Sequence, residues 1–181
     1  YNGGREENDF LMFARNKAQS AANRPAPKPK ELVDNTVLNE CLDEQVCIFA
    51  SLPQVEENNK NDVEERKKYI KILENAAKLT KQFNIKWVYS YARVHADFEN
   101  ALNLGQNGFP AIGLISSKKK VYSHLYRAFT EENIVSWAKS AGAGRVASAI
   151  NYQSLPSIKN VPKWDNQTNN VEKQTIYKDE L

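Results

Sequence analysis

The sequence predicts a single α/β domain in which helices cover a mixed central sheet. Apolar runs short enough for buried strands alternate with helical periodicities, and the last two strands follow each other closely before a final helix. With 181 residues, 41% of them hydrophobic, the chain can bury one core without a metal or a disulfide framework. The formal net charge of +3 is small and interspersed, which excludes a nucleic-acid-binding footprint.

The N-terminal segment is expected to lie outside this domain. Residues 5–18 have the periodicity of a helix, and residues 19–30, with three alternating prolines, are typical of an extended linker. An isolated helix of this length has little to pack against. We therefore interpret residues 1–18 as the end of a preceding domain.

The first half of the domain alternates strands with helices. We expect strands at 31–33, 46–52 and 85–91, and a helix at 35–42. Asp62 and Glu65 resemble a capping box, which would open a long helix with a broad apolar face running to Phe83.

The second half ends in a hairpin and a helix. A short helix at 96–104 precedes the turn-rich residues 105–110 and strands at 111–115 and 121–126. Lys118, Lys119 and Lys120 between these strands indicate a solvated turn rather than a phosphate site. Thr130 caps a last helix that ends near Gly142. The resulting order, βαβαβαββα, is that of the thioredoxin fold.

The last four residues carry the most specific motif. Lys178, Asp179, Glu180 and Leu181 form a retrieval signal that returns soluble proteins to the endoplasmic reticulum (ER). We therefore expect residence in the ER lumen and the KDEL receptor as a partner. No run of residues reaches the length of a membrane span, and no signal peptide is present, so we expect a C-terminal piece of a longer secretory-pathway protein without membrane contact.

Several segments then match a known family. The most specific is Asn39-Glu-Cys-Leu-Asp-Glu-Gln-Val-Cys47 with its Cys-x5-Cys spacing, and the others are Tyr1-Asn-Gly-Gly-Arg5, Ala101-Leu-Asn-Leu-Gly105, Gly108-Phe-Pro-Ala111, Phe129-Thr-Glu-Glu132 and Pro162-Lys-Trp-Asp165. With these segments the chain resembles the ER protein disulfide isomerases of the a-a'-b type. The resemblance implies a redox-inactive b domain at 31–145 and a C-terminal extension at 146–177. That extension lacks the acidic excess common in the family, so we expect no bound calcium.

The two cysteines do not occupy a redox-active position. A redox-active relative carries Cys-x-x-Cys at the start of the helix after the central strand, where the helix dipole stabilises a thiolate, and here residues 52–55 contain no sulfur. Cys41 falls near a helix C-terminus and Cys47 inside an apolar strand, so both should be poor nucleophiles. Their spacing and an oxidising compartment favour a structural disulfide. Two free buried thiols are the second alternative, and a redox switch is the least favoured.

The resemblance also implies a cis peptide bond at Phe109–Pro110. In related folds this proline faces the active-site cysteines and leaves the preceding backbone free to pair with a peptide, but no cysteine is expected opposite it here. His95 and His124 lack zinc-ligand spacing with each other or with the cysteines, so no metal or other cofactor is expected.

Two further features concern the surface. Asn166 opens an Asn-Gln-Thr acceptor for N-glycosylation in a polar segment where Trp164 is a candidate to dock back on the domain. Aromatic residues alternate along two strands, which favours a helix-covered core over an exposed aromatic face; they are Trp87, Tyr89, Tyr91, Tyr122 and Tyr126.

The predicted function is that of a non-catalytic scaffold. The domain would hold the preceding redox-active domains through its linker and present a surface to unfolded secretory proteins and ER chaperones. The full-length relative, not this chain, would then catalyse thiol–disulfide exchange. The alternative is a thiol–disulfide oxidoreductase or redox sensor in which Cys41 and Cys47 themselves cycle.

Overall fold

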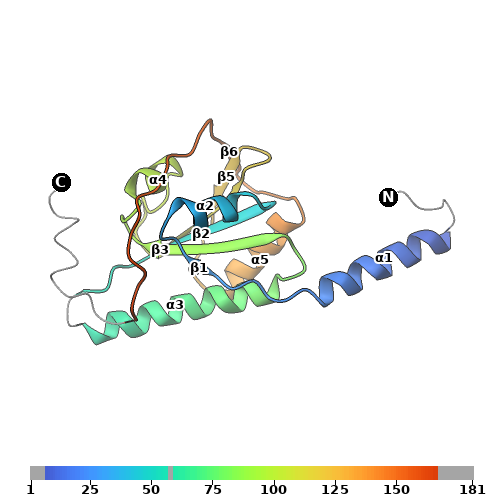
Figure 1. Cartoon of the computed structure of the whole chain (residues 1–181), viewed down its shortest axis with the longest axis horizontal. Helices are drawn as coiled ribbons and strands as arrows, with labels where there is room; N and C mark the ends of the chain where they lie inside the picture. Colours follow the sequence, from blue (N-terminus) through green and yellow to red (C-terminus); the bar gives the residue numbers. More distant parts are fainter. Residues whose placement is uncertain (1–6, 57–58, 167–181) are drawn as a thin grey trace.

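A six-stranded mixed sheet forms the centre of the molecule (Figure 1). The computed structural model describes residues 7–56 and 59–166. The strands are β1 Lys30–Glu31, β2 Val46–Leu52, β3 Ile85–Tyr91, β4 Ala111–Ser116, β5 Val121–His124 and β6 Ile150–Asn151. The helices are α1 Glu7–Ala22, α2 Asn35–Leu42, α3 Lys60–Leu79, α4 Ala96–Ala101 and α5 Glu131–Gly142.

The strand order is that of the thioredoxin fold. The sheet runs β1-β3-β2-β4-β5-β6, with β1, β3 and β2 parallel and each of β4, β5 and β6 antiparallel to its predecessor in the sheet. Parallel neighbours need helical crossovers, and α2 and α3 supply them. The predicted fold class is confirmed, with β6 as an added edge strand.

Helices cover both faces of the sheet. Every residue of β2 is buried, as expected for a central strand. Alternate positions of β2 face opposite layers: Ile48 and Leu52 pack with α3 and α5, whereas Cys47 and Phe49 pack with α2 and α4. This alternation gives the domain two apolar layers, one on each side of the sheet.

The predicted bounds of α2, β2 and β3 agree with the structure, but the capping box does not. Helix α3 begins at Lys60, with Asn59 as its N-cap, and Asp62 instead accepts from the backbone of Glu56. Thr130 caps α5 as predicted, accepting from Asn133 N at 3.3 Å. Helix α4 ends three residues early, at Ala101, because Asn103 takes a positive φ of 50°.

The N-terminal helix is longer and the linker shorter than predicted. Helix α1 continues to Ala22, and Asn23 N still donates to Gln19 O at 3.0 Å. Residues 19–22 contain no proline, so nothing ends the helix before that point. At the other end Lys30 already belongs to β1, which leaves residues 23–29 as the linker. Helix α1 projects away from the sheet (Figure 1).

The C-terminal extension is part of the fold as far as it is described. Beyond β6, Tyr152 N donates to Lys120 O, and Ile158 and Trp164 are buried at 6% and 8% exposure. The chain crosses from β6 past β1 to the start of α3 (Figure 1). Sequence periodicity missed this segment because its contacts are single anchors rather than one continuous face.

Candidate functional site

A disulfide joins α2 to the start of β2. Cys41 and Cys47 are linked by an S–S bond of 2.03 Å with their Cα atoms 5.2 Å apart. Both residues are at most 1% exposed and pack with the α2 and α4 layer. Since the chain contains two cysteines, this bond uses both.

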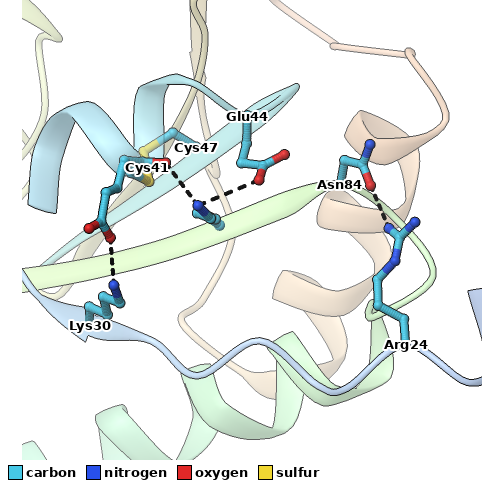
Figure 2. A network of polar contacts seen from close by, with 8 residues as sticks. Arg24, Lys30, Cys41, Glu44, Cys47 and Asn84 are labelled. Atoms are coloured by element: carbon cyan, nitrogen blue, oxygen red, sulfur yellow. Dashed lines mark hydrogen bonds and ion pairs between the residues drawn. A yellow bond between two sulfur atoms is a disulfide. The ribbon is translucent and has the colours of Figure 1, made fainter.

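Polar contacts hold the loop that closes the disulfide (Figure 2). Lys86 Nζ donates to the backbone oxygen of Glu40 at 3.2 Å and lies 3.5 Å from the carboxylate of Glu44. Lys30 bonds the Glu40 carboxylate at 2.5 Å, which lowers the pKa of that carboxyl below its usual range. The loop is thereby fixed from β1 and from β3.

The position of a redox-active pair lies at the other end of β2. Cys47 and Pro53 are six positions apart along an extended strand, a distance of about 20 Å. The peptide bond between Phe109 and Pro110 is cis, and the next residue, Ala111, pairs with Ser51 near the end of β2. The structure therefore brings Pro110 beside the 53–56 loop and leaves the disulfide at the opposite end.

A cavity of about 220 Å³ opens beside that loop. Gln54 fixes the loop by donating from Nε2 to Ala92 O at 3.0 Å. The cavity walls come from the loop and the first turns of α3 and are mostly acidic or polar: Pro53, Gln54, Glu56, Asp62, Glu65, Arg66 and Tyr69. Burial, together with the hydrogen bond that Tyr69 donates to Glu65, raises the pKa of Tyr69 to about 12.

Arg66 is the most unusual of these residues because it is 1% exposed. Its Nη2 lies 3.5 Å from Glu31 Oε1, and its guanidinium lies 3.6 Å from the ring centroid of Tyr91. Trp164 covers the group with its ring 4.9 Å from the guanidinium and donates its backbone N–H to Glu31 Oε2 at 2.9 Å. We call Glu31, Arg66 and Tyr91 the Arg66 cluster.

Burial dominates the electrostatics of this cluster. Desolvation raises the pKa of Glu31, against the hydrogen bond from Trp164 and the charge of Arg66, and it also raises the pKa of Tyr91. Arg66 was not among the predicted site residues, although the sequence carries a signal for its burial. Arg66 lies on the apolar face of the helix, at spacings of three, four and seven residues from Val63, Ile70 and Leu73. An arginine on a face that packs against the core is buried, and a buried arginine needs a partner for its charge.

A second buried carboxylate lies at the same end of β2. Glu99 of α4 is 3% exposed, accepts from Ser51 Oγ at 2.8 Å and takes the backbone N–H of Arg93 at 3.0 Å. Arg93 holds a φ of 66° in this turn. Burial raises the pKa of Glu99, and the hydrogen bonds from Ser51 and Arg93 oppose that shift.

The histidines lie in separate places. His95 Nε2 contacts Leu32 O at 2.9 Å, and burial lowers the pKa of His95. His124 contacts Leu102 O at 2.5 Å. Across the described residues, no three His, Cys, Asp or Glu side chains are grouped so as to hold a metal ion.

The remaining predicted residues divide between core and surface. Trp87 and Tyr122 are buried, Tyr89 and Tyr91 are partly buried, and Tyr126 is 67% exposed. Asn166 is exposed, but the rest of its acceptor motif and the tail Lys178, Asp179, Glu180 and Leu181 lie outside the described residues. None of the helices in the described ranges has the length and hydrophobicity needed to cross a membrane.

Comparison with known proteins places the chain in a family. The family described as PDIA6-like, C-terminal thioredoxin-like domain, matches residues 18–146. The protein disulfide-isomerase A6 homolog of Caenorhabditis elegans is 29% identical over 91% of this chain and 37% of its own length. Protein disulfide-isomerase A6 of Mesocricetus auratus is 27% identical over 100% of this chain and 43% of its own length, and the Homo sapiens protein is 26% identical over 91% and 37%.

The chain thus spans 37 to 43% of the length of these relatives. Among solved structures, the first thioredoxin domain of mouse protein disulfide-isomerase A4 aligns with a TM-score of 0.49 and 15% identity, over 70% of this chain and 84% of that one. The fold assignment rests on strand order and on the family match. The resemblance drawn from the sequence is confirmed, and this chain belongs to the family of PDIA6-like C-terminal thioredoxin-like domains, the b-type domain of a protein disulfide isomerase.

Proposed function

We propose that this chain is a non-catalytic scaffold and client-binding module of an ER protein disulfide isomerase. One observation carries the proposal: the two cysteines form a buried disulfide at the end of β2 opposite the 53–56 loop and Pro110. Thiol–disulfide exchange begins when a thiolate attacks a sulfur of the disulfide. Because both cysteines are buried, an external thiolate cannot reach either sulfur. The isomerase activity of the full-length protein would then belong to its other domains.

The proposed partners follow from the compartment. Lys178, Asp179, Glu180 and Leu181 would keep the protein in the ER lumen through the KDEL receptor. There the module would present its surface to unfolded secretory proteins and chaperones and raise their concentration near the redox-active cysteines of neighbouring domains. The linker at 23–29, which contains Pro25, Pro27 and Pro29, supports the role of a spacer.

The first experiment counts free thiols. The chain is equilibrated in glutathione buffer at the ER poise of about −180 to −210 mV, denatured without reductant, alkylated and weighed intact. We expect no alkyl adducts at any glutathione ratio in that range. A mixed population that shifts with the ratio would support the alternative, an oxidoreductase or redox sensor using Cys41 and Cys47.

The second experiment separates scaffold from enzyme. Insulin reduction and scrambled-ribonuclease refolding are measured for the chain and for a Cys41→Ser, Cys47→Ser variant, and we expect both to match the rate without protein. Turnover above the variant would overturn the scaffold proposal. Client binding is measured separately, as suppression of the aggregation of a reduced, unfolded secretory protein, and we expect suppression that grows with the concentration of the chain.

A further inference from the structure

The described part of the C-terminal extension ends in a segment that lies along the edge of the sheet. Ile158 lies opposite Asn35, Val161 N donates to Val33 O at 2.9 Å, and Trp164 N donates to Glu31. As residue numbers rise along this segment, those of its partners fall, so it runs antiparallel to residues 31–35. We call residues 158–165 the strap (Figure 1).

The strap is held by contacts that do not depend on its side chains. The side-chain amide of Asn35 pairs with the backbone of Ile158 in both directions, accepting from the N–H at 3.0 Å and donating to the carbonyl at 2.8 Å. The bond between Val161 and Val33 joins main chain to main chain. Contacts of this kind accept any extended polypeptide, as in the addition of a peptide to a sheet edge.

One side chain gives the strap its specificity. The Trp164 ring covers Arg66 at 4.9 Å and meets the Tyr91 ring edge-to-face, with centroids 6.5 Å apart and planes at 85°. A guanidinium already stacked on one aromatic ring favours contact with a second aromatic side chain. The carboxylate of Glu31 accepts a hydrogen bond from the backbone N–H of Trp164 and so fixes the position of that residue. The Arg66 cluster therefore recognises one aromatic residue within an extended segment.

The strap buries two of its side chains. Lys159, Asn160, Pro162 and Lys163 are exposed, so Ile158 and Trp164 are its buried anchors. Within the part of the chain that is described, Arg66 Nε, Arg66 Nη1 and the Tyr91 hydroxyl are buried and have no hydrogen-bond partner. Buried donors without acceptors disfavour the closed state, and opening the strap exposes them to water.

From these contacts we propose that the strap occupies, within its own chain, a docking groove for an extended segment of an unfolded polypeptide that carries a tryptophan or tyrosine. The groove consists of the Val33 carbonyl, the side-chain amide of Asn35 and the Arg66 cluster. Its occupant is inferred from the strap itself, which shows the chemistry that the groove accepts. Displacement of the strap would make the groove available, so the strap limits client access. This inference rests on the client binding proposed above and names the surface responsible.

The direct test uses the full chain and a labelled peptide of residues 156–166, which contains the strap: Pro-Ser-Ile-Lys-Asn-Val-Pro-Lys-Trp-Asp-Asn. Fluorescence anisotropy is measured with the wild type, with Trp164→Ala, and with Asn160→Ala as a matched change at an exposed position on the strap. We expect Trp164→Ala to bind at least ten-fold more tightly than the wild type and Asn160→Ala to match the wild type. A peptide with alanine in place of its tryptophan should lose binding. Equal affinity of wild type and Trp164→Ala, or no binding by either, would overturn the proposal.

Hydrogen exchange of the wild type provides a test that needs no variant. We expect the amides of Val161 and Trp164 to exchange at least 100-fold faster than those of β2, and faster still with excess peptide. Exchange at the rate of β2, or no response to the peptide, would overturn the proposal even if Trp164→Ala fails to fold. Peptide binding without suppression of client aggregation would instead count against the proposed function and leave the groove intact.

Discussion

The two ends of strand β2 differ in what they expose. At the Val46 end, the disulfide is buried and its loop is held by lysines from two strands. At the Leu52 end, the 53–56 loop, Pro110 and the Arg66 cluster meet beside a polar cavity. The first end is a closed cross-link, and the second is the surface that we propose binds an extended polypeptide. In a redox-active relative the cysteine pair and the cis-proline lie at the same end of the central strand, because the cysteines begin the helix that follows this strand.

This difference separates the place of the disulfide from the place of the sheet edge and of the cis peptide bond. The sheet edge and the cis peptide bond at Pro110 are features of the backbone. Thiol–disulfide exchange, by contrast, requires a cysteine thiolate at one particular position. The following experiments test how independent the two ends are, from the largest expected effect to the smallest.

Arg66→Ala should produce the largest loss of stability. It leaves Glu31 as a buried carboxylate without its cation and removes the contact with Tyr91, which together should lower the free energy of unfolding by about 3 to 5 kcal/mol. Urea titration followed by circular dichroism measures the loss. The double variant Glu31→Gln, Arg66→Met should recover a large part of it, and a loss below about 1 kcal/mol in the single variant would show that the pair is not a buried ion pair in solution.

Removing the disulfide should have the next largest effect. Cys41→Ala, Cys47→Ala opens a loop with a sequence separation of 6, which in the chain-entropy model lowers the free energy of unfolding by about 2 to 2.5 kcal/mol. Urea titration checks this, with the reduced wild type as control. The comparison of the two ends also requires that peptide binding by Trp164→Ala stays unchanged when the cysteines are removed, and a loss of binding would show that the ends are coupled.

Glu99→Gln should change the pH dependence of stability. Burial raises the pKa of Glu99 above 4.5 in the folded state, so the stability linked to its proton is full below about pH 4.5 and is lost as the pH rises through the folded pKa. Relative to Glu99→Gln, the wild type should therefore lose stability from about pH 4.5 upward. Urea titrations of both proteins at several pH values measure the difference in their free energies of unfolding. His95, whose pKa is lowered by burial, gives the opposite pH trend, but it is present in both proteins and cancels in this difference. A flat difference would contradict the prediction.

Lys86→Met should have the smallest effect. The Lys86 and Glu44 side chains are 43% and 36% exposed, so losing their pairing should lower the free energy of unfolding by less than about 1 kcal/mol. The loop before Cys47 should nevertheless loosen, and the rate of disulfide reduction by dithiothreitol should rise. Lys118→Met, in the exposed turn between β4 and β5, is the control. An unchanged reduction rate would show that Lys86 does not hold the loop.

Local patterns predicted the regular elements well. The apolar runs at 46–52 and 85–91 and the helix at 35–42 agree with β2, β3 and α2, because a fully buried strand or an amphipathic helix leaves its pattern in neighbouring residues. The N-cap of α3 was predicted three residues too late, at Asp62, whereas Asn59 takes that position in the structure. The prediction made helix α1 too short and the linker too long. The prolines lie only in the second half of the predicted linker, and the residues before them continue the helix to Ala22.

The Arg66 cluster and the strap could not be predicted in the same way. Glu31, Arg66 and Trp164 are separated by tens of residues, and although the helix face of Arg66 indicates burial, no local pattern names its partners. Trp164 was a candidate to dock, but its partners were not named. The place of Pro110 beside the 53–56 loop likewise follows from the pairing of β2 with β4.

By itself the sequence determined the fold class, the family and the absence of sulfur from residues 52–55, because each of these depends on residue type and local spacing. Only the tertiary structure decided that Arg66 is buried between Tyr91 and Trp164, that the strap covers the edge at β1, and that the disulfide lies at the end of β2 away from Pro110. These features depend on which strands become neighbours and which segment returns to the sheet. That choice is made by the burial of the whole core and not by any stretch of chain taken alone.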